Sequence, residues 1–301
     1  MSAATPGAAI SAPDARLARA GRRLPRIGWA GVTLVGLISM LALAAPWLSP
    51  YRVAELAGRP LESPSSSHLV GTNAIGQDLA SQLLSGARAS LLVAAVAGGA
   101  TVAFGAAVGM LAGWKGGRVD AVLMRVTDVV LTTPRLPLLI VAGAYAGRDL
   151  FTVAMIIAAT FWPPVTRVVR AQVMSLRQRA HVTAAVGFGA GTAHVLRLHV
   201  LPGIGLILAA ELVTAAARAV ALESGLAFLG LGDPTRASWG AIMREALGFS
   251  GLFYTSAWTW WLVPPVVAVS CLLLGITFLG LALEQRLNPR LVRHRLEGSA
   301  W

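Results

Sequence analysis

Charged side chains are scarce in this sequence, and cysteine is almost absent. Asp, Glu, Lys and Arg make up 13% of the 301 residues, whereas hydrophobic residues make up 56%. A soluble domain needs a more polar surface than this composition supplies, so the chain is predicted to be a polytopic membrane protein. Cys271 is the single cysteine, which excludes an intrachain disulfide framework. Because Cys271 lies in an apolar run, we expect its side chain to be buried.

Sequence signatures of catalysis are missing as well. No G-x-x-x-x-G-K-[ST] loop is present, so the chain has no phosphate-binding loop of this kind for a nucleotide. No serine lies in a nucleophile elbow, and no aspartate pair has protease-like surroundings. We therefore expect no enzymatic activity, no metal site and no cofactor bound by this chain. The histidines, which show no metal-ligand spacing with acids or the cysteine, are His68, His181, His194, His199 and His294.

Lysine is nearly absent too, and the net charge of +12 comes almost entirely from arginine. The arginines lie between apolar runs, which favours cytoplasmic loops that follow the positive-inside rule over nucleic-acid binding. With both termini in the cytoplasm, 17 of the 25 basic residues fall on the inner side, six fall outside and two lie within spans. This asymmetry predicts that the N-terminus and the C-terminus are both cytoplasmic.

Six apolar runs are long enough to cross a bilayer, and the predicted fold is therefore all-α with six transmembrane helices. The first run, 27–48, resembles the core of a signal peptide, but it exceeds the usual length of about 7–15 residues, so we expect it to remain as a span. The other runs are 91–112, about 119–146, 150–169, 202–222 and about 258–283.

Prolines and ionisable groups mark two of these spans. The third contains Pro134 and Pro137 together with charged side chains, which predicts a kinked helix that faces protein or water rather than lipid. The fourth is predicted to be broken at Pro163-Pro164. The resulting segments are a disordered basic cytoplasmic tail at 1–26, the first transmembrane helix at 27–48, an extracytoplasmic loop at 49–88, a transmembrane core at 89–284 and a cytoplasmic tail at 285–301.

The polar stretch 181–202 separates the fourth and fifth spans. Apolar residues recur in it at helical spacing, glycines at 187, 189 and 191 permit a sharp turn, and Pro202 opens the next span. This pattern predicts a helix-turn-helix on the membrane surface that is joined directly to a transmembrane helix. Such an element can receive a push from a soluble partner and transmit it into the membrane.

This stretch resembles the signature cytoplasmic loop of ABC importer membrane subunits. Ala184 and Ala185 stand at the two alanine positions of that loop, Gly189 at the glycine position, and Leu201-Pro202 at its end. Thr183 stands where the family has a glutamate, so a charged contact made by that glutamate is absent here.

Three further segments resemble the dipeptide, oligopeptide and nickel branch of the same family. Before the second span, the family pattern matches at Gly71, Thr72, Gly76, Asp78, Gly86, Ala87, Arg88, Ser90 and Leu91, whereas Asn73 and Gln77 replace an acid and a base. Because both charges are lost together, we expect the exchange to be compensated. After the fifth span, the matches are Glu223, Leu226, 228–232 and 238–240, and this segment is expected to lie outside the cytoplasm with Trp239 at the level of the lipid headgroups. The segment 287–291 resembles the family's ending.

The resemblance covers about residues 68–290 and implies the fold of type I ABC importer permeases in a bacterial inner membrane. It also implies the partners: a homologous second permease subunit, two ATPase domains or subunits that bind ATP and Mg²⁺, and an external solute-binding protein. The implied function is import of short peptides, with nickel or another small nutrient as the alternative. A secondary transporter and a non-transporting scaffold are the alternatives of other classes. The residues expected to couple to the ATPase are Thr183, Ala184, Ala185, Gly189, His199, Leu201 and Pro202.

The fifth span carries polar residues on one face. Glu211, Thr214 and Arg218 are spaced i, i+3 and i+7, so they share a side of the helix. Two interpretations remain open at this point: Glu211 and Arg218 form an internal pair that holds helices together, or the stripe lines the translocation path together with Glu223.

Overall fold

The computed structural model describes residues 26–287. The predicted basic tail, except Arg26, and residues 288–301 of the C-terminal tail lie outside the described residues. Within the described part every regular element is a helix, and two isolated β-bridges are the only strand-like pairings. The elements are α2 (Arg26–Leu48), α3 (Leu79–Lys115), α4 (Gly117–Thr132), α5 (Arg135–Ala146), α6 (Leu150–Arg177), α7 (Ala180–Gly187), α8 (Thr192–Val195), the π-helix η1 (Leu196–Val200), α9 (Leu201–Phe228), α10 (Trp239–Gly248), the 3₁₀-helix η2 (Leu252–Tyr254), α11 (Trp258–Trp261) and α12 (Val263–Leu287).

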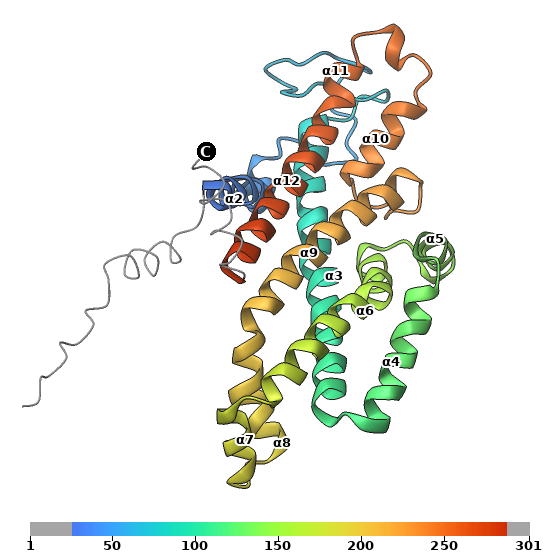
Figure 1. Cartoon of the computed structure of the whole chain (residues 1–301). Helices are drawn as coiled ribbons and strands as arrows, with labels where there is room; N and C mark the ends of the chain where they lie inside the picture. Colours follow the sequence, from blue (N-terminus) through green and yellow to red (C-terminus); the bar gives the residue numbers. More distant parts are fainter. Residues whose placement is uncertain (1–25, 288–301) are drawn as a thin grey trace, which may run out of the picture.

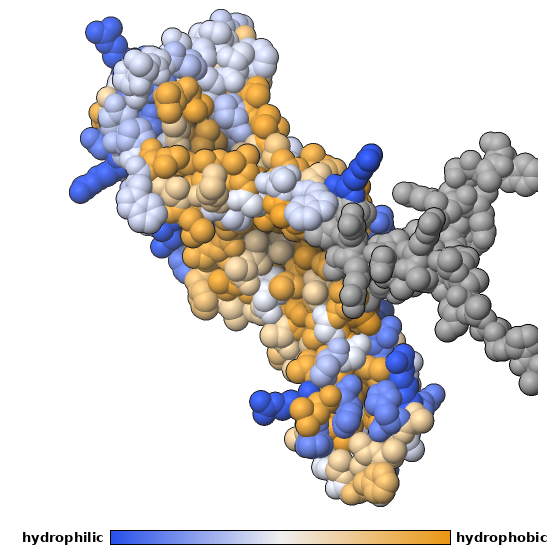
Figure 2. Space-filling model, turned by 90° about the vertical axis from the view of Figure 1, so that its left-hand side faces the viewer, coloured by the Kyte–Doolittle hydropathy of each residue, from blue (hydrophilic) through white to orange (hydrophobic). Residues whose placement is uncertain are grey.

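Among the described residues, five helical segments are long and apolar enough to cross a membrane, and α4 with α5 makes a sixth if the bent pair is one span. The all-α fold is therefore confirmed, and the number of candidate spans equals the predicted six when α4 and α5 are counted together. Figure 2 shows hydrophobic side chains over the middle of the molecule and hydrophilic side chains concentrated towards its two ends. Such a band is the surface that a bilayer requires.

The centre of the bundle is the packing of α3 against α6 and α9 (Figure 1). Gly105, Gly109 and Gly113 recur every fourth residue on α3 and face α6. A Cβ atom at Gly109 would lie 2.7 Å from the Thr166 carbonyl oxygen, so the two backbones touch where the glycines lie. The Thr166 hydroxyl donates to the Gly105 carbonyl at 3.0 Å, which adds an interhelical hydrogen bond. Small residues at this spacing are a common basis of helix association in membranes.

The third span is interrupted between α4 and α5, whose axes differ by 85°. Pro134 precedes α5 in an extended conformation, as expected for a residue that cannot continue the helix before it. The predicted kink is therefore confirmed. The acids of α4 face α6: Asp120 forms a bidentate ion pair with Arg170, and an Asp128 oxygen lies 2.6 Å from an Arg167 nitrogen.

The opposite side of α4 is exposed in this subunit. Val122, Val126 and Val129 point away from the other helices. The acids of α4 thus face protein, as predicted, whereas its valines form a surface that the described helices leave uncovered.

α6 runs without interruption through Pro163-Pro164, so the predicted break in the fourth span is wrong. Trp162 and Val165 are buried at this point against the glycine stripe of α3. A proline removes one backbone hydrogen bond, and packing on both sides can keep the helix continuous despite this loss. At its start, Asp149 accepts hydrogen bonds from the Thr152 hydroxyl and backbone N–H, which lower the pKa of its carboxyl group.

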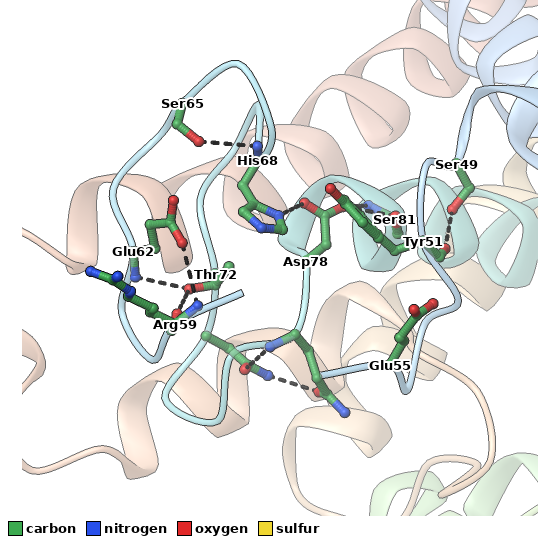
Figure 3. A network of polar contacts seen from close by, with 12 residues as sticks. Ser49, Tyr51, Glu55, Arg59, Glu62, Ser65, His68, Thr72, Asp78 and Ser81 are labelled. Carbon is green, nitrogen blue, oxygen red and sulfur yellow. Dashed lines mark hydrogen bonds and ion pairs between the residues drawn. The ribbon is translucent and has the colours of Figure 1, made fainter. Parts of the chain in front are cut away.

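The loop before α3 is folded around a buried contact between His68 and Asp78, shown in Figure 3. The His68 Nδ1 atom lies 3.0 Å from an Asp78 oxygen, and both side chains are buried. The other Asp78 oxygen accepts from the Ser81 backbone N–H at 2.8 Å and caps the helix. Because of this cap, α3 begins at Leu79, and the last ten residues of the predicted loop 49–88 are helical.

Asn73 and Gln77 are direct partners in this loop. The Asn73 amide nitrogen donates to the Gln77 side-chain oxygen at 2.9 Å, and the Gln82 amide nitrogen donates to the same oxygen at 2.8 Å. A neutral hydrogen bond therefore occupies the place where the resembling family carries an acid and a base. This contact confirms that the double exchange is compensated.

Two side chains, those of Trp239 and Cys271, lie in surroundings that differ from the predicted ones. Trp239 is 2% exposed, so its ring packs inside the subunit and does not face the lipid headgroups. Its indole N–H donates to the Leu83 carbonyl at 3.0 Å, and its ring covers Gly86 of α3, whose missing side chain leaves the space. Cys271 is only partly buried, because α12 presents it near the surface of the bundle.

Candidate coupling element and translocation path

The predicted helix-turn-helix is present at the end of the molecule where α7 and α8 lie (Figure 1). α7 ends in a Schellman motif: the Gly189 N–H donates to the Val186 carbonyl and the Ala190 N–H to the Ala185 carbonyl, each at 3.0 Å. Gly189 has a φ of +83°, whereas Gly187 and Gly191 do not have positive φ. The turn therefore depends on one glycine of the three.

One face of this hairpin is anchored to the bundle. Val182, Val195 and Val200 are fully buried in a cluster with side chains of α6 and with Ile204 of α9. The hairpin is thus held to the spans by apolar packing and does not hang as a slack loop.

The other face of the hairpin carries apolar side chains in the open. Phe188, at the turn, is 93% exposed, and Val186 and Leu198 are about half exposed. Exposed aromatic and aliphatic side chains gathered at the tip of a polar end are typical of a protein-binding surface.

The hairpin continues directly into the fifth span. Thr192–Phe228 forms one helical segment of 37 residues, in which η1 joins α8 to α9. Pro202 has no N–H to donate to the carbonyl four residues earlier, and at this point the Leu201 N–H donates to the Leu196 carbonyl in the wider π pattern. A displacement of α8 can therefore pass along α9 through backbone hydrogen bonds.

The remaining residues of the predicted coupling set lie around the turn. The Thr183 hydroxyl bonds within its own helix to the Arg179 carbonyl at 3.2 Å and makes no charged contact. A cavity of about 400 Å³ opens beside it, lined also by Arg177 and Asp120. Ala184 is exposed, and its carbonyl accepts from the Phe188 N–H at 2.9 Å.

Three histidines gather at the hairpin, although their spacing in the sequence does not predict it. The His199 ring lies 6.2 Å from the His181 ring and 6.3 Å from the His194 ring, measured between centroids. Within residues 26–287 no group of three His, Cys, Asp or Glu side chains is arranged to hold a metal ion. The turn at Gly189, which folds two helices back on each other, is the signal that could have predicted this proximity.

Arg218, on the fifth span, contacts an aromatic ring instead of an acid. Its guanidinium carbon lies 5.4 Å from the centre of the Phe161 ring, and that of Arg135 lies 4.9 Å from the same ring. Within the described residues no carboxylate oxygen lies within 4.0 Å of either guanidinium. The proposed ion pair between Glu211 and Arg218 is therefore not formed, because Phe161 of α6 takes the place next to Arg218.

The other path candidates differ in their surroundings. Glu211 is half-buried, and Thr214 is exposed with its hydroxyl bonded to the Ala210 carbonyl at 3.0 Å. Glu223 is 3% exposed and lies at the junction of α9 and α10, with the Ser224 hydroxyl 3.5 Å from its carboxylate. Glu223 thus lies inside the subunit in this conformation, whereas Glu211, Thr214 and Arg218 reach its surface.

Residues 105–293 match the family of binding-protein-dependent transport system inner membrane components. The chain belongs to this family. The matched region of the permease contains the hairpin, α9 and both arginines that contact Phe161, so the site described above lies within the part that defines the family.

Named relatives cover nearly the whole permease. A Brucella suis protein whose name describes a peptide permease is 32% identical over 288 residues, which is 94% of each chain. The dipeptide transport system permease protein DppC of Bacillus subtilis is 33% identical over 281 residues, covering 91% of this chain and 86% of its own. A Brucella abortus protein named for a peptide transport system permease is 32% identical over 270 residues, covering 89% and 88%.

Proposed function

We propose that this permease is one of two homologous membrane subunits of an ATP-driven importer of short peptides. The family places it in a binding-protein-dependent system of the inner membrane, and the relatives named above are described as peptide or dipeptide permeases. Its partners in this proposal are a second permease subunit, two ATPase domains or subunits that hold ATP and Mg²⁺, and an external solute-binding protein. The chain itself supplies half of the path and binds no cofactor.

The observation that carries the proposal is the hairpin of α7 and α8. It combines a buried face, an exposed apolar tip at Phe188 and a continuous connection to α9. We assign this end to the cytoplasm, with both termini inside, because the basic residues of the sequence concentrate on that side. Loop 49–78 and the end at α10 and α11 then face outwards, where a solute-binding protein delivers its ligand.

The mechanism follows from how these parts are joined. The ATPase subunits bind the tip of the hairpin, and their closure on ATP displaces Thr183, Ala185, Gly189, His199 and their neighbours together. Because α8, η1 and α9 form one segment, the displacement tilts α9 and moves Glu211, Thr214 and Arg218 relative to the second subunit. Glu223 becomes reachable only when α10 moves away from α9. The shared cavity thereby alternates between its outer and inner openings.

Reconstitution of the complex tests this function. The permease is co-expressed with candidate ATPase subunits and a candidate second permease subunit from the same genome, purified through a tag on this chain, and placed in vesicles. We expect the ATPase subunits to co-purify and trialanine uptake to require ATP and the solute-binding protein. Uptake driven by an ion gradient without ATP would indicate a secondary transporter. A chain that purifies alone and supports no uptake would indicate a scaffold.

A further inference from the structure

Arg135 and Arg218 both contact the Phe161 ring. They come from two different helices and lie near the break in the third span. Arg135 is the first residue of α5, directly after the 85° bend, and Arg218 lies on α9. Phe161 belongs to α6 and is buried among side chains of α5, α6 and α9, so the ring is a fixed platform. Cation–π contact holds both guanidinium groups near it.

Both groups lie within the hydrophobic part of the molecule. Arg218 is 17 residues from the start of α9, which corresponds to about 25 Å of helix at 1.5 Å per residue, and Arg135 lies between the two halves of a broken span. Charged side chains at such depth are costly, and they commonly mark substrate pathways. Two cations near one ring also repel each other, so the arrangement favours an anion close to both of them.

The described part of the permease does not supply that anion. No carboxylate lies within 4.0 Å of either guanidinium, and neither group donates a hydrogen bond to a described protein atom. Both side chains are only half-buried, so a ligand at the subunit surface can reach them. By contrast, Arg167 and Arg170 on α6 already hold Asp128 and Asp120.

We propose that Arg135 and Arg218, held on Phe161, form a subsite that binds the free C-terminal carboxylate of the transported peptide. A guanidinium presents five N–H donors in a fork that matches a carboxylate, and every linear peptide with an unmodified end carries this group. The inference rests on the proposed function, because it specifies which part of the substrate the path recognises.

The position of Glu211 agrees with this assignment. It lies seven residues before Arg218 on the same face of α9, about 10 Å away along the helix axis at 1.5 Å per residue. An extended peptide spans about 3.3–3.6 Å per residue, so a tripeptide with its carboxylate at the arginines places its amino end near this acid.

Uptake of trialanine and of trialanine amide by the reconstituted complex tests the subsite. The two probes differ only in the terminal carboxylate. The ratio of their uptake rates is measured for the wild type, Arg135→Gln, Arg218→Gln and the control Arg52→Gln, an exposed arginine of the loop before α3. Because the same solute-binding protein serves all of them, its own preference cancels when ratios are compared between variants.

We expect Arg135→Gln and Arg218→Gln each to lower the acid-to-amide ratio about tenfold, mainly through slower uptake of the acid, as loss of a charge-assisted hydrogen bond predicts. ATP hydrolysis stimulated by the loaded solute-binding protein should persist, and Arg52→Gln should keep the wild-type ratio. If the glutamine variants do not assemble, the acid-to-amide uptake ratio is measured for Arg135→Lys and Arg218→Lys instead. They keep the charge and lose the fork, so the ratio should fall about threefold.

An unchanged ratio in variants that take up the acid normally would overturn the subsite. A parallel fall of both rates, again without a change in ratio, would also overturn it and would show a structural clamp or a contact with an acid of the second permease subunit. A wild-type complex that takes up neither probe would instead contradict the proposed peptide substrate, and the subsite with it.

Discussion

Replacement of Gly189 by valine is expected to lower uptake at least about fivefold while the permease still inserts and assembles. Gly189 has a φ of +83° at the end of α7, and nothing lies within 4 Å of the position of an added Cβ atom. The substitution therefore acts through backbone conformation and not through a clash. A β-branched residue in this region costs about 1–3 kcal/mol, which at 1.4 kcal/mol per tenfold depopulates the native turn strongly. Uptake per assembled complex is the measurement.

Gly189→Asn is the matched control for this substitution. Asparagine adds a side chain of similar size but tolerates positive φ, so most of the uptake should remain. Full uptake by Gly189→Val would count against the role of the turn in coupling. Equal loss in both variants would indicate that bulk at the hairpin surface, and not its backbone geometry, is what the ATPase subunit rejects.

Replacement of Gly109 by leucine is expected to prevent stable packing of the bundle. A Cβ atom there would lie 2.7 Å from the Thr166 carbonyl oxygen and 2.9 Å from the Val169 Cβ, so α3 and α6 must separate. Overpacking of a tight core costs about 1–3 kcal/mol, occasionally more, and separation also threatens the hydrogen bond from Thr166 to Gly105. We expect most of the variant to aggregate, or its melting temperature in detergent to fall by several degrees, as measured by size-exclusion chromatography after heating.

Gly99→Leu on the same helix separates packing from a general effect of glycine replacement. No atom lies within 4 Å of its added Cβ position, so we expect wild-type behaviour in the same assay. The packing account would be wrong if Gly109→Leu were as stable as Gly99→Leu.

Structural features that depend on a single segment could be predicted from the sequence. Span length and hydrophobicity predicted the helices, Pro134 predicted the break after α4, and the glycine spacing in 181–202 predicted the turn. These features follow from local chemistry: a proline lacks an N–H, a glycine accepts positive φ, and an apolar run must leave water.

Contacts between residues of different helices could not be predicted from the sequence. Trp239 looked like an interfacial residue, yet Gly86 on a distant helix leaves space for its ring. Glu211 and Arg218 lie on one helix face, so a pair between them was one of two open interpretations, but Phe161 and Arg135 approach Arg218 from two other helices. The histidines at 181, 194 and 199 are scattered in sequence and gather only after the hairpin folds. Only the tertiary arrangement determines these contacts.

Site-directed crosslinking in the assembled importer tests the central claim most directly. A Cys271→Ala background removes the single native thiol, and cysteine is then placed either at Phe188, on the hairpin tip, or at Phe253, in η2 at the opposite end. Treatment with a short bifunctional reagent should join position 188 to an ATPase subunit and leave position 253 unjoined to it. Absence of a product from position 188, with an ATPase product from position 253, would contradict the account of the α7–α8 hairpin as the element that couples ATP hydrolysis to transport.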